Sequence, residues 1–410
     1  MKIAVIGLGK LGLPLALLLS KRDHDVLGID TNKSRITSIE EGVVENEPGL
    51  SALLKEVERK NFEVTNKFDT KITECDLIFL ILPTPSKIDH KFSSELIKDS
   101  ILEIVSMKFK TSLVDICIVS TVNPGDSREI EKIIAKSSAK SETKFNLYYS
   151  PEFIALGTII KNMENPDSIL LGEHKVNSIG GDKIVNVLKT LALNEPKICR
   201  MSLTSAEITK IAINSYVTTK ISFANFIGEL ADKFQEADKF SILQSIGSDS
   251  RIGEKYLRPG LGFGGPCFPR DNRAIAAMAK EVGVSADIAI ATDKVNIRQP
   301  EIRANEISER FNFQPNKNIL LLGLSYKSGS YVVEESQAIM LANELNSRGF
   351  KISVFDPISI DFAIDKLDKN IETYKIDEGV EKFDLIINAV ASTDFESITS
   401  LIPQEKYLRL

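Results

Sequence analysis

The sequence predicts an α/β protein with two doubly wound parallel-sheet domains joined by a central helical segment that contains a long helix. Its 410 residues are enough for two or three domains, since one domain takes roughly 100 to 200 residues. Short β-branched runs alternate with amphipathic helical stretches over the first 150 residues and again after residue 310, which is the rhythm of a parallel sheet covered by helices. Between these two parts the apolar residues follow helical spacing.

Four strands are predicted in the N-terminal part, each a short apolar run bounded by turn or charged residues. They are Lys2–Ile6, Asp25–Ile29, Leu77–Leu82 and Ile116–Ser120. Few Gly or Pro residues interrupt the helical spacing from Ser202 to Lys239, so we expect one long helix or two abutting helices there. The stretch Gly247–Asp271 is rich in Gly, Pro and aromatic residues, which predicts an irregular but ordered loop.

The C-terminal part repeats the β/α alternation without a second glycine-rich turn. A helical region near Ala286–Arg310 leads into it. Strands are predicted at Asn318–Leu322, Lys351–Phe355 and Leu385–Asn388, and a helix at Glu335–Arg348. We therefore expect an N-terminal domain over residues 1–200, a central helical domain over 201–300 and a C-terminal α/β domain over 301–410.

Composition and charge exclude several classes of protein. Apolar residues make up 43% and charged residues 26% of the chain, as in ordinary folded proteins and unlike disordered chains. A net charge of −6 does not suggest the basic stripe of a nucleic-acid binder. No apolar stretch approaches the roughly 18 residues of a membrane span. Small molecules are the expected partners, with no nucleic acid and no membrane.

Cysteine and histidine positions argue against a metal site and against a secreted disulfide framework. The four cysteines include no CxxC pair and lie apart from the three histidines, so no zinc-like spacing exists. The apolar N-terminus is not expected to be a signal peptide, because Lys10 and three glycines interrupt it and no small-residue cleavage site follows. We expect a cytoplasmic protein with reduced thiols and no metal.

A glycine-rich turn follows the first predicted strand. The run Gly7-Leu8-Gly9-Lys10-Leu11-Gly12 opens a helix, and Asp30 closes the next strand. Gly7 permits the tight turn, Gly9 lets the backbone approach a pyrophosphate, and Gly12 allows close packing of helix on strand. The helix N-terminus attracts the phosphates. Because Asp30 accepts hydrogen bonds from a ribose and repels a 2′-phosphate, the sequence predicts a Rossmann-like domain that binds NAD rather than NADP.

Two further turn motifs follow predicted strands of the same sheet. Leu82-Pro83-Thr84-Pro85 and Ser120-Thr121-Val122-Asn123-Pro124-Gly125 both lie just past the carboxyl end of a strand, where doubly wound sheets bind ligands. Taken singly, each motif is equally typical of residues that merely terminate a strand. Two such motifs at one sheet edge favour a cofactor cleft.

Further along the chain, four residues are of types that could take part in catalysis. Lys210 and Asn214 are four residues apart in a predicted helix, so a cation and an amide share one face and can converge on a substrate oxygen; a solvated surface pair is the commoner alternative. Cys267 lies in a glycine-rich loop where a thiol is accessible, although a lone cysteine is more often inert packing. Asp271, four residues beyond it, supplies an acid or base for thiol chemistry.

Several segments resemble one enzyme family, in order and over nearly the whole chain. They are Glu47-Pro48-Gly49-Leu50, Tyr149-Ser150-Pro151-Glu152-Phe153, Lys210-Ile211-Ala212-Ile213-Asn214, Arg251-Ile252-Gly253, Gly260-Leu261-Gly262-Phe263-Gly264-Gly265-Pro266-Cys267-Phe268-Pro269-Arg270-Asp271 and Gly323-Leu324-Ser325-Tyr326-Lys327. By these motifs the chain resembles the UDP-glucose and GDP-mannose dehydrogenases, which act on nucleotide-sugars. The resemblance is specific because the motifs match jointly.

The resemblance implies a four-electron oxidation of a sugar primary alcohol to a carboxylate, with two NAD⁺ consumed per turnover. In such a reaction Cys267 captures the aldehyde as a thiohemiacetal, which is oxidised to a thioester and then hydrolysed. The implied products are UDP-uronic acids such as UDP-glucuronate, used in polysaccharide biosynthesis for the cell envelope. The resemblance also implies a homodimer in which Arg251 reaches across to the partner's site.

The resemblance also assigns residues to three sets. The implied catalytic residues are Cys267, Lys210, Asn214, Asp271, Glu152 and Thr121. The implied NAD-binding residues are Gly7, Gly9, Lys10, Leu11, Gly12, Asp30, Lys33, Pro83, Thr84, Thr121 and Arg270. The implied substrate-binding residues are Tyr149, Glu152, Phe153, Lys210, Asn214, Arg251, Tyr256, Gly264 and Lys327. Lys210 would stabilise an oxyanion, and Thr121, Glu152 and Asp271 would hold and activate water. Arg251 and Lys327 would bind the nucleotide-sugar, whose pyrophosphate attracts cations.

Three positions depart from the family pattern. Leu156 stands where the family often has a second acid, and Arg270 replaces the lysine before the catalytic aspartate but keeps its charge. Glu334 stands where an arginine normally meets the cofactor. A charge reversal beside a pyrophosphate is expected to weaken NAD binding, unless the loop is rearranged or another cation compensates.

Two alternative functions stay open at this point. A simple two-electron β-hydroxyacid dehydrogenase also combines an N-terminal NAD fold with a Lys-x-x-x-Asn helix, but it needs neither Cys267 nor the long glycine loop. An inactive NAD-binding homologue is supported only by Leu156 and Glu334. No residue distinguishes a uracil from a guanine pocket, or glucose from an N-acetylated hexosamine. UDP-glucose is therefore taken only as the default substrate.

Overall fold

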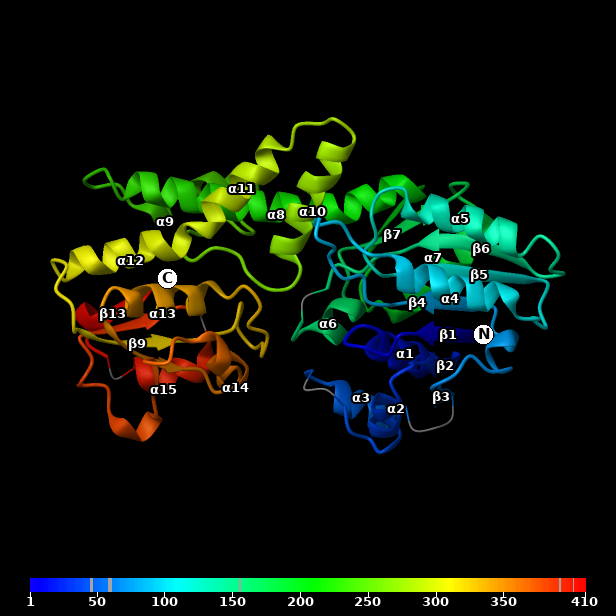
Figure 1. The fold of residues 1–410 in the computed structure, drawn as a ribbon, viewed down its shortest axis with the longest axis horizontal. Coiled ribbons are helices and arrows are strands. Elements are labelled where there is room, and N and C mark those ends of the chain that lie inside the picture. Colours follow the sequence, from blue (N-terminus) through cyan, green and yellow to red (C-terminus); the bar gives the residue numbers. More distant parts are fainter. Residues whose placement is uncertain (45–46, 58–60, 155, 391, 401) are drawn as a thin grey trace. The chain divides into compact units, whose positions relative to one another are not determined.

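The chain forms two compact units, whose elements are labelled in Figure 1. The computed structural model describes residues 1–44, 47–57, 61–154, 156–390, 392–400 and 402–410. Unit 1 comprises Met1–Ile211 and unit 2 comprises Ala212–Leu410. The expected three-domain division, with boundaries at residues 200 and 300, stays a prediction.

Among the described residues, unit 1 contains an eight-stranded sheet in the order β3-β2-β1-β4-β5-β6-β7-β8. Its strands are β1 (Lys2–Ile6), β2 (Asp25–Ile29), β3 (Phe62–Thr65), β4 (Leu77–Leu80), β5 (Leu113–Ile118), β6 (Lys144–Tyr149), β7 (Ser168–Glu173) and β8 (Lys197–Ser202). Neighbouring strands pair in parallel, except that β6 and β7 are antiparallel. The strand order reverses between β1 and β4, and doubly wound sheets bind ligands at such a point.

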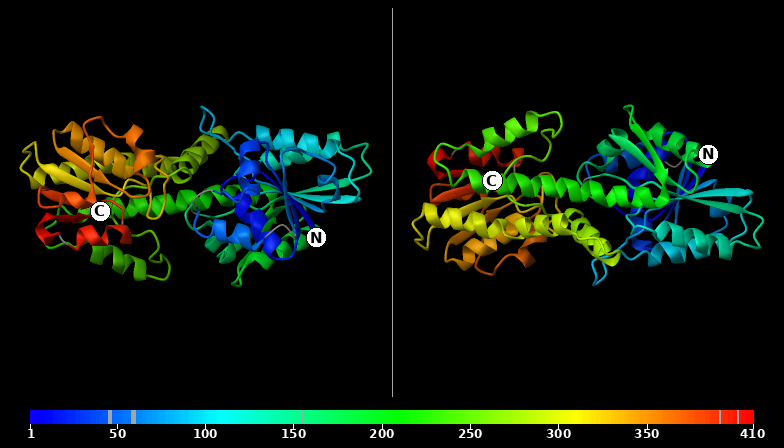
Figure 2. Two further views of the ribbon diagram at one scale, coloured as in Figure 1. Left: turned by 90° about the horizontal axis from the view of Figure 1, so that it is seen from below. Right: turned by 90° about the horizontal axis from the view of Figure 1, so that it is seen from above.

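Helices cover both faces of this sheet, as the left view of Figure 2 shows. They are α1 (Gly12–Lys21), α2 (Lys33–Glu40), α3 (Leu50–Glu56), α4 (Glu95–Ser106), α5 (Asp126–Ser137), α6 (Ile159–Glu164) and α7 (Ile179–Leu191). On one face α4 packs beside α5, and on the other α1 packs beside α3, α6 and α7. This is the covered parallel sheet that the β/α alternation predicts.

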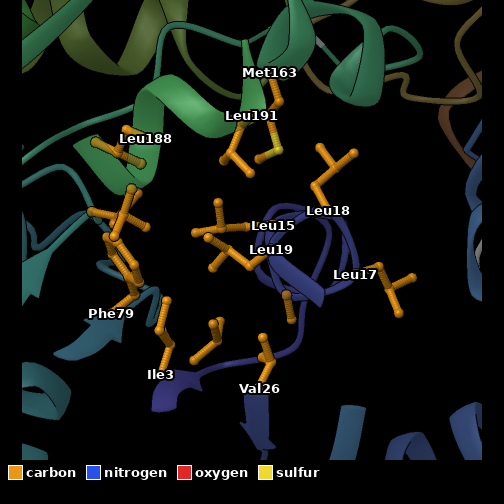
Figure 3. Packing of buried hydrophobic residues seen from close by; sticks show 14 of the residues in the cluster. Ile3, Leu15, Leu17, Leu18, Leu19, Val26, Phe79, Met163, Leu188 and Leu191 are labelled. Carbon is orange, nitrogen blue, oxygen red and sulfur yellow. The ribbon is translucent and has the colours of Figure 1, made fainter. Parts of the chain in front are cut away.

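The strand sequences explain why both faces of the sheet are buried. In β1, Ile3 and Val5 belong to one apolar cluster, whereas Ala4 and Ile6 belong to the cluster on the opposite face. Successive side chains of a strand point to opposite faces, so an uninterrupted apolar run predicts a strand covered on both sides. Figure 3 shows the first cluster, with Leu15 of α1 among its members. Each fully buried Leu or Ile contributes roughly 1.5 to 3 kcal/mol to stability.

The long helix α8 (Leu203–Ala231) contains the boundary between the two units. The next helix, α9 (Lys239–Ser248), begins separately because the Asp238 side chain caps it by accepting hydrogen bonds from two backbone N–H groups. The predicted helical stretch from Ser202 to Lys239 is therefore one long helix followed by the start of a second. Unit 2 continues with α10 (Phe268–Glu281), α11 (Asp287–Ile297) and α12 (Gln299–Arg310).

Among the described residues, unit 2 contains a five-stranded sheet in the order β11-β10-β9-β12-β13, with every pairing parallel. Its elements are β9 (Asn318–Leu322), α13 (Gln337–Ser347), β10 (Lys351–Phe355), α14 (Ile360–Ala363), β11 (Glu372–Thr373), β12 (Leu385–Asn388), α15 (Glu396–Thr399) and β13 (Tyr407–Arg409). The strands β9, β10 and β12 have the bounds that the sequence predicted. The fold class is confirmed: two Rossmann-like sheet domains joined by a helical segment.

Candidate active site

The glycine turn between β1 and α1 is shaped to receive a dinucleotide. Gly7 has φ +91°, and a Cβ there would lie 2.2 Å from the Ile81 carbonyl oxygen. A Cβ at Gly12 would lie 1.8 Å from the Gly7 carbonyl oxygen, so only glycine permits this contact between helix and turn. At Gly9 the nearest atom to a Cβ is Nη1 of Arg35, at 3.5 Å. The backbone is therefore open on the side from which a pyrophosphate approaches.

Asp30 is held against this turn at the end of β2. Its carboxylate accepts hydrogen bonds from Leu8 N–H at 2.9 Å and from Asn32 N–H at 2.9 Å. Nη1 of Arg35 donates a third at 3.3 Å. The acid thus has a fixed orientation beside the glycines, which is the arrangement that recognises a ribose.

A cavity of about 430 Å³ opens beside the turn. Of the predicted cofactor residues, those that line it are Gly7, Gly9, Lys10, Leu11, Asp30 and Pro83. Arg35 also lines it and places a cation beside Gly9. Arg35 was not among the cofactor residues predicted from the sequence, although its place in the first turn of α2, five residues after Asp30, was a usable signal. An open backbone, a helix N-terminus, a ribose acid and a nearby cation together fit NAD.

The other predicted cofactor residues lie outside the lining of this cavity. Lys33 is exposed on α2, Thr84 is buried after β4, and Thr121 is half-buried after β5. Arg270 belongs to unit 2, where its Nε donates to Asp271. Gly12 acts through packing, as described above. For Lys33, Thr84, Thr121 and Arg270 the NAD contact stays a prediction.

The turn motifs after β4 and β5 are tied to each other by side-chain hydrogen bonds. Ser120 Oγ accepts from Leu82 N–H at 2.8 Å and donates to the Leu82 carbonyl oxygen at 2.7 Å. The Asn123 amide bonds both main-chain groups of Phe92, at 2.9 and 2.8 Å. These four hydrogen bonds join the segments after β4 and β5 into one sheet edge. Residues that only terminate two separate strands would not need such bonds.

Lys210 on α8 lies against the segment that follows β6. Its Nζ donates to the Glu152 carbonyl oxygen at 2.7 Å and lies 4.7 Å from the centre of the Phe153 ring. The residue is only 8% exposed. A carbonyl oxygen and an aromatic face both stabilise an ammonium, so the charge is fixed beside the Glu152 segment, as an oxyanion-stabilising group requires.

The Glu152 carboxyl has a raised pKa. Burial raises the pKa of its carboxyl to about 7, and the Lys210 charge opposes this shift. A carboxyl with such a pKa transfers protons efficiently at neutral pH. Nearby, Leu156 packs against the first apolar cluster. The position where the family often has a second acid is thus occupied here by core packing.

Glu207, one turn before Lys210, fixes α8 to the start of α5. Its fully buried carboxylate accepts hydrogen bonds from Gly125 N–H at 2.6 Å and from Ser127 N–H at 2.8 Å. The first N–H groups of a helix have no partner within the helix, and here a distant carboxylate supplies one. Burial raises the pKa of this carboxyl. Glu207 could not be predicted from the sequence, because its partners lie about 80 residues away.

Cys267 lies at the N-terminal end of α10 in unit 2. Its side chain is exposed, and its carbonyl oxygen accepts the Asp271 N–H at 2.8 Å. The irregular loop predicted over Gly247–Asp271 is therefore shorter at both ends: α9 extends to Ser248, and residues 268–271 already form the first turn of α10. Pro269 suits this turn because the first N–H groups of a helix need no partner within it. An exposed thiol at a helix start is open to a ligand.

Asp271 and Asn214 meet beside the turn that carries the thiol. Asn214 Nδ2 donates to Asp271 Oδ2 at 2.7 Å, and Arg270 Nε donates to Oδ1 at 3.2 Å. Asp271 is 1% exposed. Buried carboxylates need such partners, so one function of the Asn214 amide is to hold this acid. Lys210 precedes Asn214 by four residues on the same helix.

One predicted substrate residue of unit 2, Gly264, lines a cavity beside the glycine loop. This cavity of about 220 Å³ is lined by Gly264, by residues 258–262 and by Ser325 and Tyr326. Nζ of Lys327, the next residue, lies 5.9 Å from the centre of the Tyr326 ring. The cavity is also lined by residues that follow β9 and β12, and Rossmann-like sheets bind ligands at their carboxyl strand ends.

Arg251 and Tyr256 lie in the loop before α10, and Tyr149 lies in the core. The Arg251 side chain is 84% exposed and forms an ion pair with Asp249. Tyr256 is half-exposed, and its ring packs edge-on against Phe268 with centroids 6.5 Å apart. Tyr149 is 0% exposed within the second apolar cluster. Because β6 is an interior strand covered by helices, this placement does not support a substrate contact by the Tyr149 ring.

The described part of the chain contains neither a metal-binding cluster nor a membrane-spanning helix. Within it, no group of three or more His, Cys, Asp or Glu side chains is arranged to hold a metal ion. Nor is any helix of that part both long enough and apolar enough to cross a bilayer.

Comparison with known families relates this geometry to a reaction type. Residues 1–191 match the NAD binding domain of the UDP-glucose/GDP-mannose dehydrogenase family, residues 204–298 its central domain and residues 320–408 its UDP binding domain. The chain belongs to the UDP-glucose/GDP-mannose dehydrogenase family. The resemblance stated from the motifs is thereby confirmed.

Relatives of the family span nearly the whole chain. UDP-glucose 6-dehydrogenase AglM of Haloferax volcanii is 29% identical, with 98% of this chain and 93% of the relative covered. GDP-mannose 6-dehydrogenase of Azotobacter vinelandii is 29% identical, with 99% and 95% covered. The solved UDP-glucose dehydrogenase of Pyrobaculum islandicum is 25% identical with a TM-score of 0.85, covering 96% of this chain and 91% of that chain.

Membership of the UDP-glucose/GDP-mannose dehydrogenase family confirms NAD as the cofactor, since the matching N-terminal domain is the family's NAD binding domain. The glycine turn, Asp30 and Arg35 are the residues that would hold it. Family members act on different nucleotide-sugars, so membership alone selects neither the base nor the sugar.

Proposed function

We propose that the protein oxidises the C6 hydroxymethyl group of a nucleotide-sugar, UDP-glucose by default, to the carboxylate of a uronic acid. The proposal is carried by the exposed thiol of Cys267 at the start of α10, with Asp271 and Asn214 beside it. An alcohol-to-aldehyde oxidation needs no thiol. An alcohol-to-acid oxidation does benefit from one, because covalent capture holds the reactive aldehyde and converts it into a species that can be oxidised again.

Each group of the chain has a role in the proposed reaction. When bound, NAD⁺ supplies the hydride acceptor for each of the two oxidations. Lys210 stabilises negative charge on the C6 oxygen. The Cys267 thiol adds across the aldehyde C=O, with its sulfur bonding to carbon and its proton passing to oxygen, and the thiohemiacetal then gives up a hydride and a proton to become a thioester. Glu152 accepts a proton from water, which adds to the thioester carbon; the C–S bond then breaks and releases the acid and the thiol. Thr121 and Asp271 assist in holding this water.

The nucleotide end of the substrate is assigned to unit 2. Its cavity is lined by residues 258–262 and lies next to Lys327, and unit 2 includes the segment that matches the family's UDP binding domain. Lys327 and Arg251 supply cations for the two negative charges of a pyrophosphate. A uridine nucleotide is therefore the first choice, and guanosine the alternative.

Counting NADH per sugar consumed tests the proposal against its alternatives. With NAD⁺ and a panel of UDP-glucose, UDP-N-acetylhexosamines and GDP-mannose, we expect one sugar to yield two NADH per molecule oxidised. One NADH per molecule would favour a two-electron dehydrogenase. No turnover with any sugar, alongside measurable NAD binding, would favour an inactive homologue.

An apolar stripe on α8 supports a homodimer. Tyr216, Phe223, Phe226 and Leu230 are each 45% to 64% exposed, and their spacing of seven, three and four residues places them on one helix face. A row of large exposed apolar side chains on one face is typical of a protein interface. We assign this face to a second copy of the chain, with the exposed Arg251 completing the partner's site.

Subunit mixing tests this assignment. Arg251→Ala and Cys267→Ser should each be inactive alone, and mixed dimers should recover about one quarter of the wild-type rate, because half of randomly paired dimers hold one complete site. No recovery would place Arg251 in its own subunit's site. In sedimentation, Phe226→Glu should give monomers, whereas Phe313→Glu, at an exposed phenylalanine outside the stripe, should not. A monomeric wild-type chain would contradict the dimer.

A further inference from the structure

Arg273, in the second turn of α10, joins two other segments of unit 2. Its Nη1 and Nη2 donate to Oε1 and Oε2 of Glu335 at 2.7 and 2.8 Å, a parallel two-point contact. Its Nε donates to Asp293 Oδ2 of α11 at 3.4 Å. A planar guanidinium is suited to such paired contacts, which fix direction as well as distance. The guanidinium therefore relates α10, α11 and the segment before α13 to one another.

The segment that Arg273 holds lies directly against the glycine loop before Cys267. The Glu334 carbonyl oxygen accepts the Gly265 N–H at 2.8 Å. A Cβ at Gly264 would lie 2.4 Å from the Glu335 carbonyl oxygen, and one at Gly265 would lie 2.5 Å from the Tyr326 ring. Gly264 and Gly265 are thus closely covered by the segment 326–335, which includes Lys327.

Glu335 adopts a backbone conformation that requires support. Its φ is +47°, a left-handed value that residues with a Cβ rarely adopt. Such a residue persists only where the surrounding structure holds it, and such residues concentrate at functional sites. The two hydrogen bonds from Arg273 and the close approach of Gly264 are contacts that hold Glu335 in place. Without the guanidinium we expect the segment to relax toward an ordinary φ and the glycine loop to loosen.

We propose that Arg273, acting through Glu335, is a positioning residue that keeps the Cys267 loop at a fixed spacing from the Lys327 segment. This inference rests on the proposed function, in which the thiol must meet a carbon of a substrate held by Lys327. Reactions of bound groups lose rate steeply when the groups are misplaced by about 1 Å. Glycine residues have the greatest backbone freedom, so a glycine loop that carries a nucleophile needs an external support.

The Arg273–Glu335 ion pair is partly exposed, so its proposed positioning role can be told apart from a contribution to global stability. The side chains of Arg273 and Glu335 are 29% and 36% exposed, and partly exposed ion pairs add little to global stability. Loss of the pair should therefore change the local order of the loop much more than the melting temperature. The Glu334 side chain, which stands where the family has an arginine, is exposed and takes no part in this contact.

Hydrogen exchange of the glycine loop tests the inference without relying on activity. In Arg273→Gln, we expect amide exchange of the peptide covering residues 260–268 to accelerate about tenfold or more, with a melting temperature within about 3 °C of wild type. Arg273→Lys keeps the charge but not the two-point contact, so it should give an intermediate rate. Glu335→Gln should match Arg273→Gln, and the double variant should add nothing further. Arg348→Gln, which removes a partly buried arginine paired with Glu344 on α13, should leave this peptide unchanged.

Kinetics complete the test. For a sugar that the wild type oxidises, Arg273→Gln should lower kcat about tenfold, with KM for the nucleotide-sugar within about twofold, since the thiol rather than binding is disturbed. Unchanged exchange, or faster exchange with wild-type kcat, would overturn the inference. If the wild type oxidises no sugar, the proposed function fails and the role in catalysis fails with it, while the exchange data still report whether the contact orders the loop.

Discussion

Replacing Cys267 by serine is expected to lower the rate of NADH formation by about three orders of magnitude or more, as loss of a covalent nucleophile does in other enzymes. The hydroxyl is a much weaker nucleophile than a thiol at neutral pH, so the aldehyde is not captured. The affinity for the nucleotide-sugar should survive, because the assigned binding groups, Lys327 and Arg251, are untouched. Steady-state NADH formation and equilibrium titration of the nucleotide-sugar measure the two quantities separately.

A second cysteine provides the matched control. Cys199 on β8 is half-buried, and Cys199→Ser should retain wild-type turnover. Cys75 and Cys117 are buried, and burial raises the pKa of the Cys75 thiol to about 12 and that of the Cys117 thiol further still, so neither can substitute as nucleophile. Equal turnover of Cys267→Ser and wild type would remove the thiol from the mechanism.

Activity should rise with pH through an apparent pKa near 7, and Glu152→Gln should abolish that rise. Burial raises the pKa of the Glu152 carboxyl to about 7, so the carboxylate that accepts a proton from water is depleted below this pH and complete above it. Loss of a general base costs about 10² to 10⁴ in rate. The measurement is kcat from pH 5.5 to 8.5, with the thioester hydrolysis step followed in single turnovers.

An exposed acid gives the comparison for Glu152. Glu129→Gln removes a carboxylate in the first turn of α5 whose side chain is 63% exposed, and it should leave the pH profile unchanged. A profile of Glu152→Gln that keeps the inflection near pH 7 would assign the titration to a different group. A fall in activity above pH 7 in the wild type would mean that the protonated carboxyl is the active form.

Local patterns predicted much of the fold. The strands at Lys2–Ile6 and Asp25–Ile29 have the predicted bounds, because each is an apolar run that starts at a charged residue and ends at a turn signal. Of the strands in unit 1, β3, β6, β7 and β8 were not predicted. β8 reads Lys-Ile-Cys-Arg-Met-Ser and lies at the sheet edge with no fully buried residue, so it carries neither a continuous apolar run nor clear alternation.

The residues of the candidate site could likewise be predicted only where their contacts are local in sequence. The glycine turn and Asp30 could be identified from spacing because their contacts are made within one βαβ unit. Glu207 and Arg273 could not, since their partners lie about 80 and 62 residues away. Tyr149 stands in a motif of the family, and an interior strand places its ring in the core, so its substrate contact stays a prediction.

What the sequence determined by itself is the alternation of strands and helices at both ends of the chain, the dinucleotide turn and the identity of the groups able to do chemistry, because these follow from side-chain type and short spacing. Only the tertiary structure decided that Lys210 rests on the Glu152 carbonyl, that Asn214 holds Asp271 and that burial brings the pKa of Glu152 to about 7. Each of these contacts depends on which distant segments exclude water from a side chain and which segments supply its hydrogen-bond partners. Local sequence patterns do not specify contacts between residues that lie far apart in the chain.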